Sequence, residues 1–220
     1  MPSIEGVLFD LDGVLVDTEP IWERVRRAFA EQRGARWSSE IQERMMGVRT
    51  ADWSTALSEL IGGAIPPQAV ADTVVDGLSF AYRTHLPVIP GAVEAVRALS
   101  GRFRLGLVSG SPQSLIDLIL ELTDLAGCFE VAMSADEVAR GKPFPDPYLG
   151  LARRMHLNQE VCAAVEDSAN GIRSAATAGA RVVAIPRGDH RPNEETLQLA
   201  AAVLPSIAEL TPDLVMTLLA

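Results

Sequence analysis

The chain has 220 residues, of which 48% are hydrophobic and 22% are charged. This length suits one core domain with a modest insert. The proportions of hydrophobic and charged residues exclude a disordered or fibrous chain. The formal net charge is -10, so the chain repels polyanions and we expect no nucleic-acid partner. A small anionic substrate would need a local cation at its binding site.

The cysteines and the N-terminal sequence indicate a reducing location. Cys128 and Cys162 lack the spacing of a zinc site, and they do not suggest a disulfide framework. The N-terminus has acidic residues where a signal peptide has basic ones, and no apolar run reaches membrane-spanning length. We therefore expect a cytoplasmic protein with no membrane partner. No heptad pattern or apolar stripe indicates assembly, so we expect a monomer.

The first predicted element is a short buried strand over residues 4–9, which ends at Asp10. Apolar residues then recur at helical spacing over residues 19–33. Further helical stretches begin near Ser38, Thr50 and Pro66. No strand pattern appears in this part of the sequence, so we predict an all-helical insert over residues 17–86.

Strand and helix patterns alternate after this insert. The predicted strands cover residues 104–108, 130–133, 161–165 and 181–185, and the predicted helices cover residues 93–99, 114–122, 147–155 and 171–178. Residues 186–195 are polar enough for an exposed loop. The alternation predicts a doubly wound α/β core with a mostly parallel sheet, built from residues 1–16 and 87–220. The carboxyl ends of its strands lie at one edge, where such sheets bind ligands.

Two acidic residues follow the first predicted strand. Asp10 and Asp12 stand two positions apart, immediately before Gly13. A structural turn needs only one such side chain. Two neighbouring carboxylates repel each other unless a cation or a shared proton relieves them. The pair therefore indicates a metal site or acid–base chemistry, although a turn remains an alternative at this point.

Three other loops carry polar residues at the same predicted edge. Ser109 and the Gly110 N–H could bind phosphate, or the serine could be an ordinary helix N-cap. Lys142 stands in a stiff proline-rich loop, although a single lysine is usually solvated. Glu166 and Asp167 follow a strand, where an N-cap is again the simpler interpretation. Each feature is weak alone, but together they predict a phosphate site.

Carboxylate oxygens are hard ligands, and Mg²⁺ prefers a few of them together with substrate phosphate. The metal and Lys142 would offset the charge of a phosphate within this acidic chain. We therefore expect Mg²⁺ as the cofactor and a small phosphorylated metabolite as the partner.

These residues resemble the motifs of the haloacid dehalogenase superfamily, in its phosphatase branch with a helical cap. The sequence FDLDGVLVDT over residues 9–18 is similar to the first motif, and Ser109 to the second. Lys142 within Gly-Lys-Pro is similar to the third motif, and Glu166-Asp167 to the fourth. The resemblance covers nearly the whole chain, and four ordered motifs are far more specific than one Asp-x-Asp.

The resemblance implies a phosphatase that works through a phospho-aspartyl intermediate. Asp10 would be the nucleophile, and Asp12 would protonate the leaving oxygen and then activate water. The implied metal ligands are Asp10, the Asp12 backbone carbonyl and Asp167, with Glu166 beside them. The implied phosphate ligands are Ser109, the Gly110 N–H and Lys142. Dehalogenases of the superfamily lack the second aspartate, so Asp12 favours phosphoryl transfer.

Further similarities concern the substrate. Residues 17–22, the cap segment Gly47-Val48-Arg49 and residues 166–171 resemble those of sugar-phosphate phosphatases typified by 2-deoxyglucose-6-phosphate phosphatase. Hexose or hexitol phosphates are therefore the leading candidates, and Arg49 could contact the substrate from the cap. A β-phosphoglucomutase-type enzyme is an alternative, but it has a histidine where this chain has Trp22. A protein that binds a phosphorylated metabolite without turnover is another alternative.

Overall fold

The structure, a computed structural model, describes residues 3–187 and 191–219. Within these residues six parallel strands form one sheet in the order β3-β2-β1-β4-β5-β6. The strands are β1 (Gly6–Phe9), β2 (Arg104–Ser109), β3 (Val131–Ser134), β4 (Cys162–Glu166), β5 (Arg181–Ala184) and β6 (Ala202–Val203). The predicted doubly wound α/β fold is confirmed. The strand order reverses between β1 and β4, which is where such sheets bind ligands.

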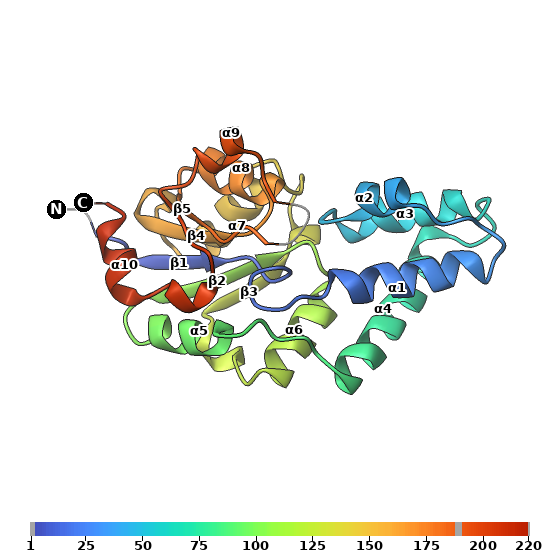
Figure 1. Ribbon diagram of the computed structural model, residues 1–220, viewed down its shortest axis with the longest axis horizontal. Helices are drawn as coiled ribbons and strands as arrows, with labels where there is room; N and C mark the ends of the chain where they lie inside the picture. Colours follow the sequence, from blue (N-terminus) through green and yellow to red (C-terminus); the bar gives the residue numbers. More distant parts are fainter. Residues whose placement is uncertain (1–2, 188–190, 220) are drawn as a thin grey trace.

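Helices cover both faces of the sheet, as Figure 1 shows. The helices on one face are α5 (Ala92–Ser100), α6 (Gln113–Leu122) and α10 (Pro212–Thr217), and those on the other are α7 (Asp146–Arg154), α8 (Ala169–Ala178) and α9 (Glu194–Leu197). Successive strand residues alternate between the two buried clusters: Val7 and Phe9 pack in the first, and Leu8 packs in the second. Both faces are thus apolar, as expected for a buried parallel sheet.

Four further helices lie between β1 and α5 in the chain. They are α1 (Glu19–Glu31), α2 (Ser39–Met45), α3 (Thr50–Leu60) and α4 (Pro67–Thr84). Figure 1 shows them grouped beside the carboxyl end of the sheet, and we refer to this group as the cap. Its two connections run side by side, because the Asp17 N–H donates a 2.8 Å hydrogen bond to the Pro87 carbonyl. None of the helices in the described residues is both long and apolar enough to cross a membrane.

The C-terminal part differs from the sequence prediction. The expected loop over residues 186–195 ends in α9, which begins at Glu194, and residues 188–190 of that loop lie outside the described residues. Helix α10 and strand β6 were not expected either. Strand β6 has only two residues and α9 only four, so neither is long enough to show a periodic pattern in the sequence.

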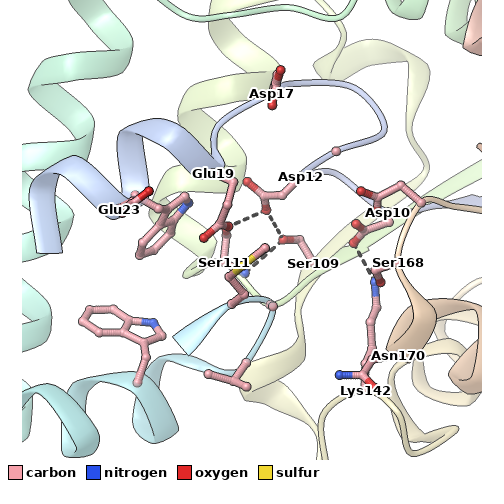
Figure 2. Close-up of a pocket in the computed structure, with 18 of the residues that line it drawn as sticks. Asp10, Asp12, Asp17, Glu19, Glu23, Ser109, Ser111, Lys142, Ser168 and Asn170 are labelled. Atoms are coloured by element: carbon pink, nitrogen blue, oxygen red, sulfur yellow. Dashed lines mark hydrogen bonds and ion pairs between the residues drawn. The ribbon is translucent and has the colours of Figure 1, made fainter. Parts of the chain in front are cut away.

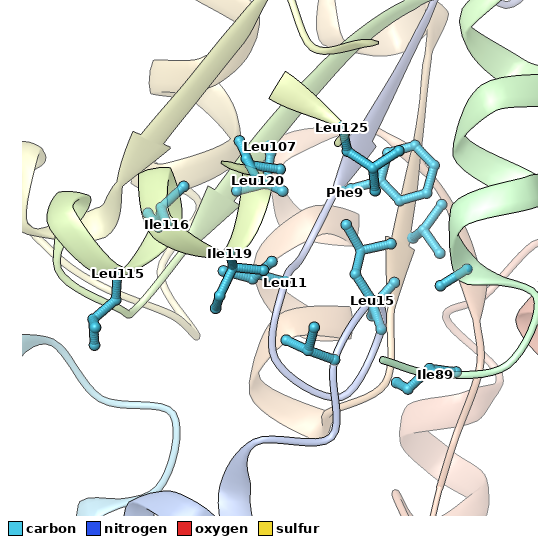
Figure 3. Close-up of a cluster of buried hydrophobic side chains, with 14 of the residues drawn as sticks. Phe9, Leu11, Leu15, Ile89, Leu107, Leu115, Ile116, Ile119, Leu120 and Leu125 are labelled. Carbon is cyan, nitrogen blue, oxygen red and sulfur yellow. The ribbon is translucent and has the colours of Figure 1, made fainter. Parts of the chain in front are cut away.

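The loop after β1 is anchored by apolar side chains. Figure 3 shows Phe9, Leu11 and Leu15 within the cluster that also contains Ile119 of α6 and Ile89 near the start of α5. Phe9 and Leu11 are fully buried. Because they point into the core, Asp10 and Asp12 are directed to the other side of the chain, where the cavity described below lies.

Candidate active site

Asp10 and Asp12 lie at the carboxyl edge of the sheet. The Asp10 N–H donates a 3.1 Å hydrogen bond to the Val165 carbonyl, which places this residue beside the end of β4. Gly13 follows with φ of +87°, and a Cβ at this position would overlap the Asp167 carboxylate. Glycine therefore allows the first loop to contact the loop after β4.

Three hydroxyl groups hold the Asp12 side chain. Thr18 donates to its Oδ1 over 2.5 Å, and Ser109 and Ser111 donate to its Oδ2 over 2.8 and 2.9 Å. Figure 2 shows the two serines facing this carboxylate. Thr18 is the N-cap residue of α1 but makes no side-chain cap bond. The N-cap of α6 is Pro112, so Ser109 is not a helix cap.

Lys142 is buried between two carboxylates rather than solvated. Its Nζ lies 2.6 Å from Oδ1 of Asp10 and 2.6 Å from Oε1 of Glu166, and only 7% of its side chain is exposed. Burial by itself lowers the pKa of Lys142, but the two carboxylates outweigh it and raise the pKa above its ordinary value. Lys142 is therefore a fixed positive charge at the carboxyl edge.

Asp10, Glu166 and Asp167 form an acidic cluster, in which one oxygen of each lies within 4.8 Å of the others. Burial raises the pKa of Asp10 to about 7 against the effect of Lys142. Burial, followed by the charges of Glu166 and Asp10, raises the pKa of Asp167 well above its usual range. One lysine cannot neutralise three carboxylates, so this set of hard oxygen donors fits a divalent cation.

The polar residues of the loop after β4 have separate roles. The Ser168 hydroxyl accepts a hydrogen bond from the Gly171 N–H and caps α8. Asp167 is therefore not needed as a cap and is available to the acidic cluster. Glu166 is fully buried and also accepts a 2.9 Å hydrogen bond from the Tyr148 hydroxyl, a contact that sequence reasoning missed.

A cavity of about 630 Å³ lies between the carboxyl edge and the cap. On the core side it is lined by Asp10, Asp12, Ser109, Gly110, Lys142 and Asp167. On the cap side it is lined by Glu19, Trp22, Arg26, Gln42, Val48 and Trp53. The volume is within the usual range for small-molecule sites. Six residues singled out in the sequence thus share one cavity, and Glu166 lies behind its wall.

Arg49 lies at the junction of cap and core but does not line this cavity. Its Nη1 donates a 2.9 Å hydrogen bond to the Ala139 carbonyl, and its Nε pairs with Asp52 over 3.1 Å. Beside it, the Thr50 N–H donates a 3.0 Å hydrogen bond to Asp136. In this conformation Arg49 therefore connects the cap to the core loop that precedes Lys142.

The family model of the haloacid dehalogenase-like hydrolases matches residues 4–179. The chain belongs to this family. The match confirms the resemblance found in the sequence, and the family and relatives together confirm an enzyme that hydrolyses phosphoric monoesters. The position of the four motifs around the cavity agrees with this membership.

Two relatives align with most of this chain. Hexitol phosphatase B of Escherichia coli K12 is 30% identical over 215 residues, which are 95% of each chain. The phosphorylated carbohydrates phosphatase of Thermotoga maritima is 32% identical over 177 residues, 80% of this chain and 82% of the relative.

Solved structures share the same architecture. CbbY from Rhodobacter sphaeroides in complex with phosphate matches with a TM-score of 0.83 and 25% identity, over 94% of this chain and 96% of the other. A β-phosphoglucomutase from Clostridium difficile also has a TM-score of 0.83, with 22% identity over 98% and 96% of the two chains. The second similarity concerns the fold alone.

Proposed function

We propose that this protein is a Mg²⁺-dependent phosphatase of sugar or sugar-alcohol phosphates that works through a phospho-aspartyl intermediate on Asp10. The observation that carries the proposal is the arrangement of Asp10, Asp12 and Lys142 around one cavity beneath the cap. The division into a core of residues 1–16 and 87–220 and a cap of residues 17–86 is part of this proposal. Cytoplasmic location and a monomeric state stay predictions from the sequence.

Asp10 and Asp12 divide the chemistry between them. An Asp10 carboxylate oxygen forms a bond to phosphorus as the bond to the substrate oxygen breaks, and Asp12 donates its proton to that leaving oxygen. Asp12 then takes a proton from water, and the hydroxide attacks phosphorus and releases Asp10 and inorganic phosphate. Covalent capture replaces one difficult displacement with two easier ones. The three hydroxyl groups around Asp12 support this role, because they hold the carboxylate in a fixed orientation.

Three groups bind the oxygens of the transferred phosphoryl group: the Ser109 hydroxyl, the Gly110 N–H and the Lys142 ammonium. Lys142 is suited to this role because its charge is fixed by two carboxylates and screened little by solvent. Ser109 contacts Asp12 in the present structure, so it exchanges this partner for a phosphoryl oxygen when substrate binds. Electrostatic positioning of this kind supplies most of the rate in phosphoryl transfer.

Asp10, Asp167 and the Asp12 backbone carbonyl would hold Mg²⁺, with Glu166 beside them. The unbalanced negative charge of the acidic cluster supports a divalent cation there. When bound, Mg²⁺ supplies positive charge that offsets the phosphoryl oxygens and relieves the repulsion between the carboxylates. Lys142, whose Nζ lies 2.6 Å from Oδ1 of Asp10, favours the ionised carboxylate that acts as the nucleophile.

The relatives and the cavity support this substrate class. Both named relatives are phosphatases of phosphorylated carbohydrates or hexitols. Arg49 as a substrate contact from the cap stays a proposal, and it requires the side chain to leave the Ala139 carbonyl. Trp22 opposes the mutase alternative, because it packs against Trp53 where a mutase has a histidine. No histidine lines the cavity within the described residues.

Phosphate release from hexitol phosphates, hexose 6-phosphates and β-glucose 1-phosphate, with and without Mg²⁺, tests this proposal. We expect release that requires Mg²⁺, and the Asp10→Asn protein should release none while remaining folded. Isomerisation of β-glucose 1-phosphate without release would favour the mutase. If these phosphate esters bound but were neither hydrolysed nor isomerised, the non-catalytic binding protein would replace the phosphatase proposed here.

A further inference from the structure

The cap wall of the cavity contains polar side chains that the proposed mechanism does not use. We name Glu19, Arg26, Gln42 and Trp53 the cap polar cluster; all four line the cavity. They come from α1, α2 and α3, so folding of the cap brings them together. Carbohydrates are bound by residues of these types, which combine hydrogen-bonding groups with aromatic surface.

Arg26 is the central residue of the cluster. Only 3% of it is exposed, and its guanidinium lies 4.3 Å from the ring centroid of Trp22 and 5.0 Å from that of Trp53. Its Nε and Nη1 are buried and have no hydrogen-bond partner among the described residues. Stacking fixes the plane of a guanidinium, so the N–H groups at its edge are held ready for a ligand.

Two neighbours also have unpaired polar atoms. In the part of the chain that the structure describes, Trp53 Nε1 is a buried donor without a partner and Gln42 Oε1 is a buried acceptor without one. The amide nitrogen of Gln42 donates to the Glu19 carboxylate. Native proteins seldom leave buried polar groups unpaired, because each unpaired group reduces stability. Several such groups on one wall of a cavity are therefore suited to pair with the hydroxyl groups of a ligand.

We propose that the cap polar cluster is the binding subsite for the uncharged, hydroxyl-rich end of the substrate. A hydroxyl group both donates and accepts, and the cluster offers donors on Arg26 and Trp53 together with acceptors on Gln42 and Glu19. This inference rests on the proposed function, since it assumes that the phosphoryl end binds at Asp10.

The charges around the cluster exclude a second anionic group at this end of the substrate. The Arg26 guanidinium lies within electrostatic range of the Glu19 and Asp12 side chains. Glu23 also lines the cavity. An anionic group near Arg26 would therefore face the carboxylates of Glu19, Glu23 and Asp12. A neutral polyol avoids this repulsion and has hydroxyl groups that suit the donors of Arg26 and Trp53 and the acceptor of Gln42.

A pair of matched ligands tests the inference by binding rather than by turnover. Sorbitol 6-phosphate and 6-phosphogluconate have the same chain length and differ at the end distant from the phosphate, which is neutral in one and a carboxylate in the other. Calorimetry with the Asp10→Asn protein and Mg²⁺ measures their affinities beside that of inorganic phosphate. We expect sorbitol 6-phosphate to bind most tightly of the three.

Arg26→Met and Trp53→Phe in the same background identify the groups responsible. We expect Arg26→Met to weaken the binding of sorbitol 6-phosphate by about ten- to one-hundredfold, because a hydrogen bond from a charged donor is lost. Trp53→Phe keeps the aromatic ring and removes only the N–H, so it should weaken binding by about threefold to tenfold. Arg24→Met is the matched control, because Arg24 is exposed on the same helix and should have no effect.

The outcomes separate this inference from the proposed function. The subsite would be overturned if Arg26→Met lost affinity equally for inorganic phosphate and sorbitol 6-phosphate, or lost affinity for neither. If 6-phosphogluconate bound more tightly than sorbitol 6-phosphate, the cluster would be an anion site instead. Selective loss together with no phosphate release by the wild-type protein would instead support the subsite and refute the phosphatase. Trp53→Phe keeps the test valid if Arg26→Met does not fold.

Discussion

The Tyr148 hydroxyl donates a 2.9 Å hydrogen bond to Oε1 of Glu166, and both side chains are fully buried behind the cavity. Burial, followed by the charge of Glu166, raises the pKa of Tyr148 well above its ordinary value, so the phenol remains a neutral donor. Oε1 also accepts from Lys142, and Oε2 accepts from the Ser168 hydroxyl over 3.2 Å. The contact therefore holds one carboxylate of the acidic cluster in place.

Tyr148→Phe should weaken metal binding as well as the fold. The variant keeps the buried ring and removes one hydrogen bond to a charged group, which costs about 1.5–3 kcal/mol. We expect the Mg²⁺ concentration for half-maximal activity to rise about tenfold, because outer contacts of metal ligands typically contribute at this level. A Mg²⁺ titration of phosphate release measures the shift. An unchanged half-maximal concentration would show that Tyr148 does not position Glu166 for the metal.

Gly171→Ala should destabilise the protein, because a Cβ at this position in α8 would overlap the Glu166 carboxylate. Overpacking of this kind costs about 1–3 kcal/mol, and the better helix propensity of alanine recovers only part of it. Gly127→Ala is the matched control, since no described residue has an atom within 4 Å of its Cβ position. Urea unfolding of both variants tests the prediction. Equal stability of the two would mean that Glu166 moves aside without cost.

Most of the core and the positions of the motifs could be predicted from the sequence. Strand β1 is buried on both sides and ends abruptly at Asp10, so its apolar run is visible to pattern analysis. The loops after β1 and β4 then meet because parallel strands align their carboxyl ends. This rule alone predicts that Asp10 and Asp167 come close, which the acidic cluster confirms.

Contacts between distant side chains could not be predicted in this way. Thr18 suited a helix N-cap by its position, but its hydroxyl contacts Asp12 instead. Tyr148 lies in α7, and nothing in the sequence around it indicates the hydrogen bond to Glu166. Arg26 follows Trp22 by one turn of α1, and only the folded cap also brings Trp53 of α3 to 5.0 Å from its guanidinium. Such contacts depend on the packing of helices and not on local sequence.

Glu19→Gln should remove part of the pH dependence of stability. Burial is the largest cause that raises the pKa of Glu19, to about 7 from the ordinary value of 4.5. The folded protein thus binds the Glu19 proton more tightly than the unfolded chain does. The contribution of this group to the free energy of unfolding is therefore fully present below pH 4.5 and is lost as the pH rises through 7.

The loss attributable to Glu19 is on the order of 3 kcal/mol. Urea unfolding of the wild-type and Glu19→Gln proteins measures this loss across the same pH range at saturating Mg²⁺. The difference between the two proteins is due to Glu19, because they share all other carboxyl groups. We expect the wild-type stability to fall more steeply with pH than that of the variant. Parallel curves would show that Glu19 ionises as readily in the folded protein as in the unfolded chain.

Asp12→Asn should separate the two steps of the proposed reaction. With p-nitrophenyl phosphate the leaving group needs no proton, so Asp10 is still phosphorylated and one equivalent of p-nitrophenol should appear in a burst. Steady turnover should then be about 10²–10⁴-fold slower, because the variant has no base to activate water. With a sugar phosphate the leaving oxygen needs the Asp12 proton, so no burst is expected.

Rapid-mixing absorbance and phosphate assays measure the two cases, with Asp10→Asn as the control that gives no burst. Wild-type rates with both substrates would contradict the acid–base role of Asp12.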